Sequence, residues 1–203
     1  LSGMNTGQVL LVRGIFASAL IAGLAWHHGA LKVPREAFHP MVALRVLGEV
    51  CATLCFITAL VHLPLANISA ILQALPLAVT MGAALFLAEP VGWRRWLAIL
   101  AGFVGVLIIV RPGLEGFNAF SLLALATVFF AAVRDIATRR IPTRIPSLLI
   151  STATTVAVTL VGAVLIMPLG GWTPMTVETT GLLLGAAVLL LFGYHFIITA
   201  MRI

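Results

Sequence analysis

Long apolar runs, separated by short polar links, follow one another along the sequence. They cover about residues 8–26, 41–63, 68–88, 97–110, 118–140, 146–168 and 181–201. A helix needs about 20 apolar residues to cross the hydrocarbon core of a bilayer. Most runs reach this length, and 97–110 does so once Trp93 to Trp96 are counted at the membrane interface. The pattern predicts an all-α fold, a polytopic membrane helix bundle of about seven spans.

Composition supports the same conclusion. Hydrophobic residues make up 62% of the 203 residues and charged residues 9%, and the mean hydropathy is +1.17. Soluble domains carry about 25% charged residues, so we expect an integral membrane protein surrounded by the lipid bilayer. The formal net charge is +6, but the basic residues lie between apolar runs and lack the interleaved aromatic residues of a nucleic-acid surface. We expect no nucleic-acid partner.

The basic residues are distributed unevenly between the two ends of the runs. When the link containing Arg94 and Arg95 is placed in the cytoplasm, every Lys and Arg except Arg13 and Arg111 falls on that side. Lys and Arg in short links favour the cytoplasm. We therefore expect a multi-pass protein of the plasma membrane, the bacterial inner membrane, with cytoplasmic links near residues 27–42, 89–95 and 134–145.

Some charged residues stand inside the runs, where they are costly. Arg13 follows the start of the first run by about a turn and a half. A long basic side chain there can extend to the nearer interface, which we favour over a role in binding. Arg134 and Asp135 stand near the end of the fifth run, where gating of a cavity competes with interfacial anchoring, the commoner role.

Glu49 is the acidic residue of the second run. It shares a helical face with Thr53 and Phe56, at i, i+4 and i+7, so its carboxylate should point into the bundle rather than at lipid. The alternative is a pair with Arg45, four residues earlier, that merely neutralises both charges. The sequence leaves these two roles open.

The third run contains a polar stripe and a proline. Ser69, Gln73, Pro76 and Thr80 fall along one side of the predicted helix. Pro76 has no N–H, so one backbone carbonyl loses its helical partner. A kinked helix with Gln73 beside the freed carbonyl would suit the wall of a polar cavity at mid-membrane depth. An ordinary packed proline kink is the alternative.

Two further candidates lie in the last run, in the half nearer the predicted cytoplasmic side. His195 shares a face with Thr199, whereas Tyr194 points about 100° away. Elsewhere, Cys51 and Cys55 lie four residues apart without His or Asp residues clustered nearby, which favours packing over a metal site. We expect no cofactor and no bound metal.

A short internal similarity links the second and seventh runs. FITALVHL at 56–63 resembles FIITAMRI at 196–203, with the matching threonines, Thr58 and Thr199, about 141 residues apart. By the predicted topology the first segment belongs to a helix that enters the membrane from the cytoplasm, and the second to one that returns to it. Repeats that run in opposite directions are typical of inverted-topology transporters.

The most specific block extends from Thr58 to Gly113. It begins with Ala59-Leu60 followed by a short turn, and continues with the mid-helix Pro76 and the Glu89-Pro90 link. The sequences RRW at 94–96 and AGFVGVLIIVRPG at 101–113 complete it. This order resembles the third to fifth helices of the EamA-type drug/metabolite transporters, and the tail GYHFIITAMRI is similar to their eighth helix. The resemblance implies two inverted five-helix repeats, incomplete here. Residues 1–113 would be most of the first repeat (helices two to five), and 114–203 the first part of the second (helices six to eight).

The resemblance also implies where a substrate would bind. The family cavity is lined largely by helices one, three, four, six, eight and nine, of which this chain would hold four. The expected substrate-binding residues are Gln73 and Pro76 on the fourth helix, Glu49 and Thr53 on the third, Arg134 on the sixth, and Tyr194 and His195 on the eighth.

These observations favour a carrier of small metabolites or drugs that works by alternating access. Proton coupling through Glu49, Asp135 or His195 and assembly as a homodimer are left open. A helical subunit that only scaffolds a larger complex is the alternative. An intramembrane enzyme is disfavoured, because the sequence has no HxxxH motif, no GxSxG motif and no paired carboxylates within a span. The sequence does not specify the substrate, the direction of transport or the coupling ion.

Overall fold

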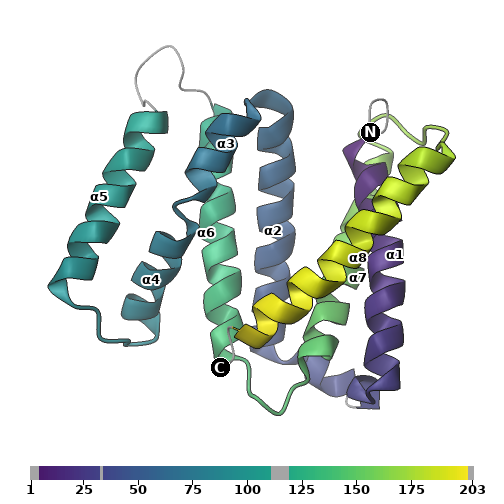
Figure 1. Ribbon diagram of the computed structural model, residues 1–203, viewed down its shortest axis with the longest axis horizontal. Coiled ribbons are helices and arrows are strands. Elements are labelled where there is room, and N and C mark those ends of the chain that lie inside the picture. The colour runs from purple at the N-terminus through teal and green to yellow at the C-terminus, as the bar shows by residue number, and fades with distance from the viewer. Residues whose placement is uncertain (1–4, 33, 111–118, 201–203) are drawn as a thin grey trace. The chain divides into compact units, whose positions relative to one another are not determined.

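The computed structural model describes residues 5–32, 34–110 and 119–200, and the regular structure in these ranges is helical (Figure 1). The helices are α1 Thr6–His27, α2 Pro40–His62, α3 Leu65–Leu72, α4 Leu75–Phe86, α5 Trp93–Val110, α6 Ala119–Arg140, α7 Ser147–Ile166 and α8 Val177–Ala200. Two short 3-10 helices, η1 Ala30–Lys32 and η2 Pro34–Phe38, lie between α1 and α2. The predicted all-α fold is confirmed.

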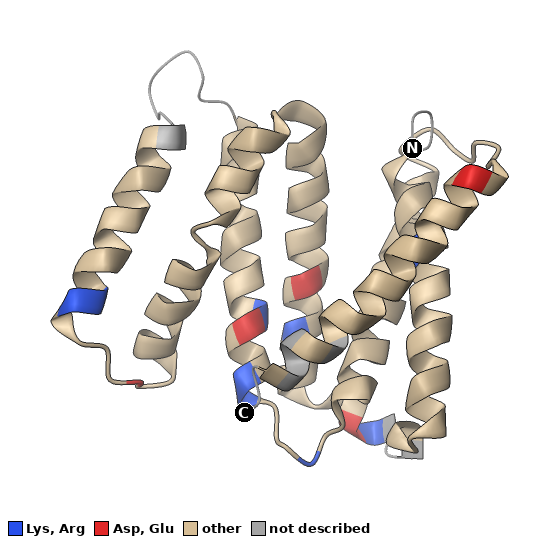
Figure 2. Cartoon of the chain, in the orientation of Figure 1, with Lys and Arg blue, Asp and Glu red and all other residues tan. Residues whose placement is uncertain are grey.

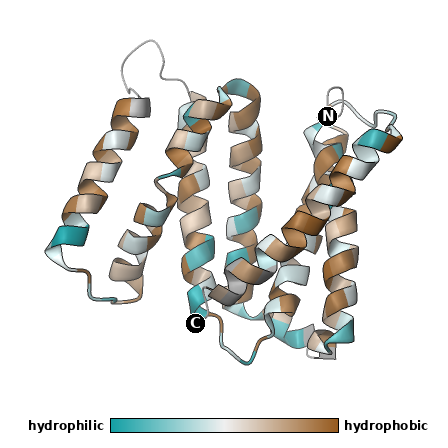
Figure 3. Ribbon diagram, viewed as in Figure 1, coloured by the Kyte–Doolittle hydropathy of each residue, from teal (hydrophilic) through white to brown (hydrophobic). Residues whose placement is uncertain are grey.

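Most of these helices are membrane spans by length and composition, and apolar residues run along them (Figure 3). In the described part of the chain, six segments are long and apolar enough to cross a bilayer, and the pair α3–α4 counts as one of them, over Leu65–Phe86. The 18-residue α5 accounts for the remaining predicted run. The prediction of a polytopic membrane helix bundle is thereby confirmed.

By their contacts, the residues form two compact units. One unit joins residues 1–46 to 138–203, and the other covers 47–137. This grouping does not test the predicted repeats, 1–113 and 114–203, because repeats are defined by internal relatedness rather than by contact. Arg111 and Arg202, which entered the predicted topology, lie outside the described residues.

In the first unit, α1 packs against α7 through glycines that bring the two backbones together. A Cβ atom added to Gly162 of α7 would lie 2.7 Å from the backbone nitrogen of Leu11, and one added to Gly7 of α1 would lie 2.8 Å from that of Ile166. A Cβ atom added to Gly14 would meet the side chain of Thr159. Because only glycine lacks this atom, these positions permit the close approach. Helix α8 contacts both partners (Figure 1).

Amide side chains attach the start of α1 to the loop between α7 and α8. Gln8 is fully buried; its Nε2 donates to the Thr173 carbonyl at 2.7 Å, and its Oε1 accepts from the Thr173 N–H at 3.0 Å. Asn5 caps α1 by accepting from Gln8 N–H at 2.7 Å, and it donates to the carbonyls of Ile166 and Gly171. These bonds satisfy a fully buried amide at one end of the helix pair.

Two of the links that we predict to be cytoplasmic lie together in this unit. Glu36 of η2 accepts a hydrogen bond from Arg144 Nε at 3.3 Å, after the end of α6. A buried apolar cluster joins the beginnings of α2 and α7 to the α6–α7 link, and consists of Val42, Ile141, Ile145, Leu149 and Ile150. The structure thus places both links at the same end of the unit, as the topology requires.

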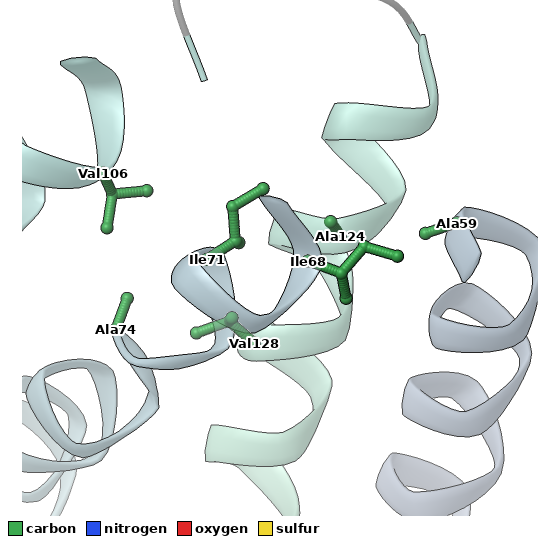
Figure 4. Packing of buried hydrophobic residues seen from close by; sticks show 7 residues of the cluster. All are labelled: Ala59, Ile68, Ile71, Ala74, Val106, Ala124 and Val128. Atoms are coloured by element: carbon green, nitrogen blue, oxygen red, sulfur yellow. The ribbon is translucent and has the colours of Figure 1, made fainter. Parts of the chain in front are cut away.

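The second unit has its own apolar core, which joins α2, α3, α5 and α6 (Figure 4). Its buried members are Ala59, Ile68, Ile71, Ala74, Val106, Ala124 and Val128. Branched side chains of α3 fill the space left by alanines on α2 and α6. At the end of α4, Ala88 has φ +53°, a left-handed conformation that turns the chain toward α5.

Gly162→Ala should lower the free energy of unfolding by about 1–3 kcal/mol, because the added methyl group meets the α1 backbone, which cannot move aside independently. Gly23→Ala is the matched control, since a Cβ there meets nothing within 4 Å. Thermal and denaturant unfolding of the full-length protein in detergent measures the stability of both variants relative to the parent. Equal stabilities for the two variants would contradict the proposed backbone contact.

Candidate functional site

Glu49 of α2 and the adjacent Arg134 and Asp135 of α6 form a buried ionic cluster in the second unit. Arg134 Nη1 donates to Glu49 Oε2 at 2.8 Å, and Arg134 Nε donates to Asp135 Oδ1 at 2.6 Å. The side chains of Glu49 and Asp135 are only 11% and 5% exposed. One guanidinium therefore serves two carboxylates that are largely hidden from solvent.

A glycine places Glu49 within reach of α6. A Cβ atom on Gly48 would lie 3.0 Å from the Phe130 carbonyl oxygen and 3.1 Å from the backbone nitrogen of Arg134. The backbones of α2 and α6 are therefore close at the residue that precedes Glu49. The short distance lets a glutamate and an arginine meet without extending into lipid.

The cluster lies well inside the membrane-spanning segments. Glu49 is about 13 Å along α2 from Pro40, and Arg134 is about 9 Å from the end of α6 at Arg140, at 1.5 Å per residue. The acidic residues within α2 and α6 are visible in Figure 2. Either carboxylate can accept a proton, because a charge in a low-dielectric region is costly.

The structure refines both sequence-based alternatives for these charges. Arg45 is 2% exposed, and its Nη1 donates to Thr154 Oγ1 of α7 at 2.6 Å, whereas Glu49 pairs with Arg134. Each residue thus has a partner on another helix, so neutralisation of Arg45 by Glu49 within α2 is not their sole role. Interfacial anchoring, which we favoured for Arg134 and Asp135, does not by itself account for the ion pair with Glu49.

The helix predicted to be kinked at Pro76 is broken in the structure. α3 ends at Leu72, Gln73 and Ala74 form a turn, and α4 begins at Leu75. The Ala74 N–H donates to the Ile71 carbonyl at 3.0 Å, which is one residue tighter than in an α-helix. Since Pro76 has no N–H, it leaves the Leu72 carbonyl without the bond that a continuous helix would provide.

The side chain of Gln73 at this break is exposed, and it makes no hydrogen bond to any residue that the structure describes. Pro76 is exposed as well, and its carbonyl accepts from Thr80 Oγ1 at 2.8 Å. Thr53 is half-buried, one turn beyond Glu49 on α2. The break therefore offers an uncommitted amide at about the middle of a 22-residue span.

Tyr194 of α8 lies in the first unit, where it borders a small cavity of about 10 Å³ with Arg13 and Gly14 of α1 and Thr155 of α7. Sequence reasoning did not select Arg13, because it expected that side chain to extend to the interface. The sequence feature that could have led to the selection of Arg13 is its position as a basic residue well inside an apolar run. His195 is the next residue of α8, but its side chain lies outside the described part.

The predicted site residues therefore do not form a single cluster. Glu49 and Arg134 are brought together, with Asp135 as a member that our selection missed. Gln73 and Pro76 lie at a helix break in the same unit, and Tyr194 belongs to the other unit. The substrate-binding role of each of these residues stays a prediction.

Comparison with known proteins adds the family. Residues 1–111 match the EamA-like transporter family. The chain belongs to this family. The resemblance deduced from the Thr58–Gly113 block is thereby confirmed, as is the prediction of a multi-pass membrane protein.

Several bacterial relatives of this EamA protein are named for transport. It is 40% identical to a riboflavin transporter of Vibrio cholerae over 90 residues, which are 44% of this chain and 30% of the relative. It is 28% identical to a pseudopaline exporter of Pseudomonas aeruginosa over 203 residues, with 97% of this chain and 69% of the relative covered. An S-adenosylmethionine uptake transporter of Rickettsia felis is 26% identical over 131 residues, with 63% and 44% covered. No solved structure matches the chain.

These comparisons define what is common to the relatives and what is not. Their names describe transporters of small molecules, not enzymes, and the three named molecules differ from one another. The EamA chain spans less than a third of the first relative and about two thirds of the second.

Arg134→Gln should lower the free energy of unfolding by about 3 kcal/mol, because it leaves two carboxylates in a buried region without their cation. Combining Arg134→Gln with Glu49→Gln should recover part of the lost free energy of unfolding. A double-mutant cycle, based on unfolding of the full-length parent, the two single variants and the double variant, measures this recovery.

Arg144→Gln is the matched control for this cycle. It breaks the ion pair with Glu36, in which the Arg144 side chain is 68% exposed, and should cost less than about 1 kcal/mol. If Arg134→Gln were as mild as Arg144→Gln, the cluster would not be a buried, mutually dependent group.

Proposed function

We propose that this protein is part of a membrane transporter that moves a small organic molecule by alternating access. The observation that carries the proposal is the family match over residues 1–111, together with the transport functions after which the relatives are named. The helical spans and the polar groups inside them supply a physical basis. The orientation proposed from the basic residues places the links near 27–42, 89–95 and 134–145 in the cytoplasm of a bacterial cell.

The α3–α4 break is the proposed centre of the binding site. A discontinuous membrane helix exposes backbone carbonyls at the end of its first half and N–H groups at the start of its second half. The amide of Gln73 stands beside these groups, and its donors and acceptor can recognise a polar substrate. Such a site needs no metal or cofactor, because hydrogen bonds and shape supply the recognition.

We further propose that the Glu49–Arg134–Asp135 cluster couples transport to protons. In this cluster one guanidinium holds two largely buried carboxylates within the membrane. Protonation of one carboxylate removes its charge and weakens its hold on Arg134. A change in the pairing between α2 and α6 is the kind of two-state event that links proton binding to a conformational step.

Gln73→Ala should reduce saturable flux of the substrate by at least about ten-fold, because a buried substrate group loses its hydrogen-bond partner. Uptake and efflux of labelled riboflavin, pseudopaline and S-adenosylmethionine, the molecules after which the relatives are named, measure the effect in cells that express the full-length protein. Asn67→Ala is the control, since Asn67 is an exposed amide at the beginning of α3.

Two results decide this experiment, with protein abundance measured in parallel. Loss of flux in Gln73→Ala but not in Asn67→Ala supports a binding site at the break. If no molecule moves while the parent protein is abundant and inserted, the transporter proposal fails, and a scaffold role becomes the better account.

Asp135→Asn should abolish the response of flux to an imposed pH gradient while leaving substrate exchange intact. The substitution removes the carboxylate that can take up a proton and keeps the Glu49–Arg134 ion pair, so folding should be preserved. Proteoliposomes with defined internal and external pH measure this response. Parent-protein flux that is indifferent to the gradient would refute coupling to protons.

A further inference from the structure

Two backbone carbonyls at the break between α3 and α4 have no hydrogen-bond donor among the described residues (Figure 1). In a continuous helix the Leu72 carbonyl would accept from the N–H of residue 76, which Pro76 lacks. The Gln73 carbonyl would accept from the N–H of Leu77, and the two do not form that bond across the break. Unpaired carbonyls are costly inside a membrane, so these oxygens favour a ligand that donates hydrogen bonds to them.

These two carbonyls have a common direction. Gln73 and Ala74 keep right-handed helical dihedral angles, with φ −61° and ψ −17° for Gln73 and φ −73° and ψ −13° for Ala74. Carbonyls in this conformation point toward the C-terminal end of their helix, so those of Leu72 and Gln73 are directed toward the start of α4. Residues 72, 73 and 76 fall within about 100° of one another around a helix axis, and Gln73 and Pro76 are exposed. The oxygens therefore belong to the exposed side of this unit.

The break favours a donor ligand over an acceptor ligand. Proline removes one N–H from the first turn of α4 but removes no carbonyl from the last turn of α3. The Gln73 side chain makes no hydrogen bond to a described residue, so its Oε1 can turn toward the same ligand. Neither α3 nor α4 contains a charged side chain, so neither helix supplies a cation of its own to these oxygens.

We propose that the break binds an ammonium group of the transported molecule, through the carbonyl oxygens of Leu72 and Gln73 and the Gln73 Oε1. The inference rests on the proposed transport function and specifies its substrate class as amines that carry a positive charge. An ammonium group has three N–H donors, which equals the number of these oxygens. Cations inside membranes pair with backbone carbonyls, and the C-terminal end of a half-helix carries partial negative charge that stabilises them.

The test uses methylammonium as the probe on the purified full-length protein in detergent. Tetramethylammonium has the same charge but no N–H donor, and it replaces methylammonium at constant ionic strength as the control. Methylammonium should raise the thermal unfolding midpoint of the parent protein with a saturable dependence on concentration, and tetramethylammonium should not.

Two variants change the proposed ligands separately. Pro76→Ala should abolish the methylammonium shift measured from its own midpoint, because the new N–H occupies the Leu72 carbonyl and rejoins the helix. Alanine favours helix formation, so this variant should fold. Pro90→Ala, at an exposed proline between α4 and α5, is the matched control and should keep the shift. Gln73→Ala loses Oε1 but keeps both carbonyls, and should raise the half-saturating methylammonium concentration by about ten-fold.

Several results would overturn the inference. Equal shifts with methylammonium and tetramethylammonium, no shift with either, or a methylammonium shift that persists in Pro76→Ala would contradict the ammonium site. Should Pro76→Ala fail to fold, Gln73→Ala decides, and an unchanged half-saturating concentration contradicts the proposal. If sodium ions stabilise the parent protein and methylammonium does not, the oxygens hold an inorganic ion and the inference about substrate falls.

Transport and binding are measured separately, so the two proposals can fail independently. Saturable flux without a methylammonium shift would refute the ammonium site and leave the transporter standing. A methylammonium shift that is lost in Pro76→Ala, without any flux of the parent, would support the ammonium site while refuting the transporter. Inhibition of flux by methylammonium but not by tetramethylammonium would support both.

Discussion

Helices inside a bilayer gain little by hiding apolar side chains from one another, because the surrounding lipid is equally apolar. Close contact between backbones must therefore contribute much of the cohesion. In one unit, Gly14 and Gly162 bring α1 and α7 together, and in the other Gly48 brings α2 to α6. The same contacts place the chemistry, since Glu49 follows Gly48 and Arg13 precedes Gly14. Packing and candidate function thus depend on the same few positions.

Whether a polar side chain is hydrogen-bonded within the fold distinguishes structural residues from candidate functional residues. Gln8 and Gln73 are both amides within predicted spans, yet Gln8 is fully buried with both ends of its amide bonded to Thr173, and Gln73 is exposed without a side-chain bond among the described residues. A polar group that the fold does not satisfy remains available to a ligand.

Features that act within one segment could be predicted from the sequence. The apolar runs predict the membrane spans. Pro76 interrupts the helix that contains it, because it has no backbone N–H to donate a helical hydrogen bond. Periodicity also identified the face of Glu49, but not its partner, because Arg134 lies 85 residues away on a helix whose neighbours no local pattern specifies. Asp135 and Arg13 were underestimated for the same reason: an interface suits both residues, and only tertiary contacts show what surrounds them.

The broken span has a consequence for biogenesis. Neither the eight residues of α3 nor the twelve of α4 could cross a bilayer alone. Insertion responds to the summed hydrophobicity of a segment, so Leu65–Phe86 can enter the membrane as one unit, whatever its later conformation. The break at Gln73 need not impede insertion. The backbone groups that lack helical hydrogen bonds there become energetically costly only when the segment leaves the insertion machinery and enters lipid. Water or neighbouring helices must then accompany the bend at every stage of assembly.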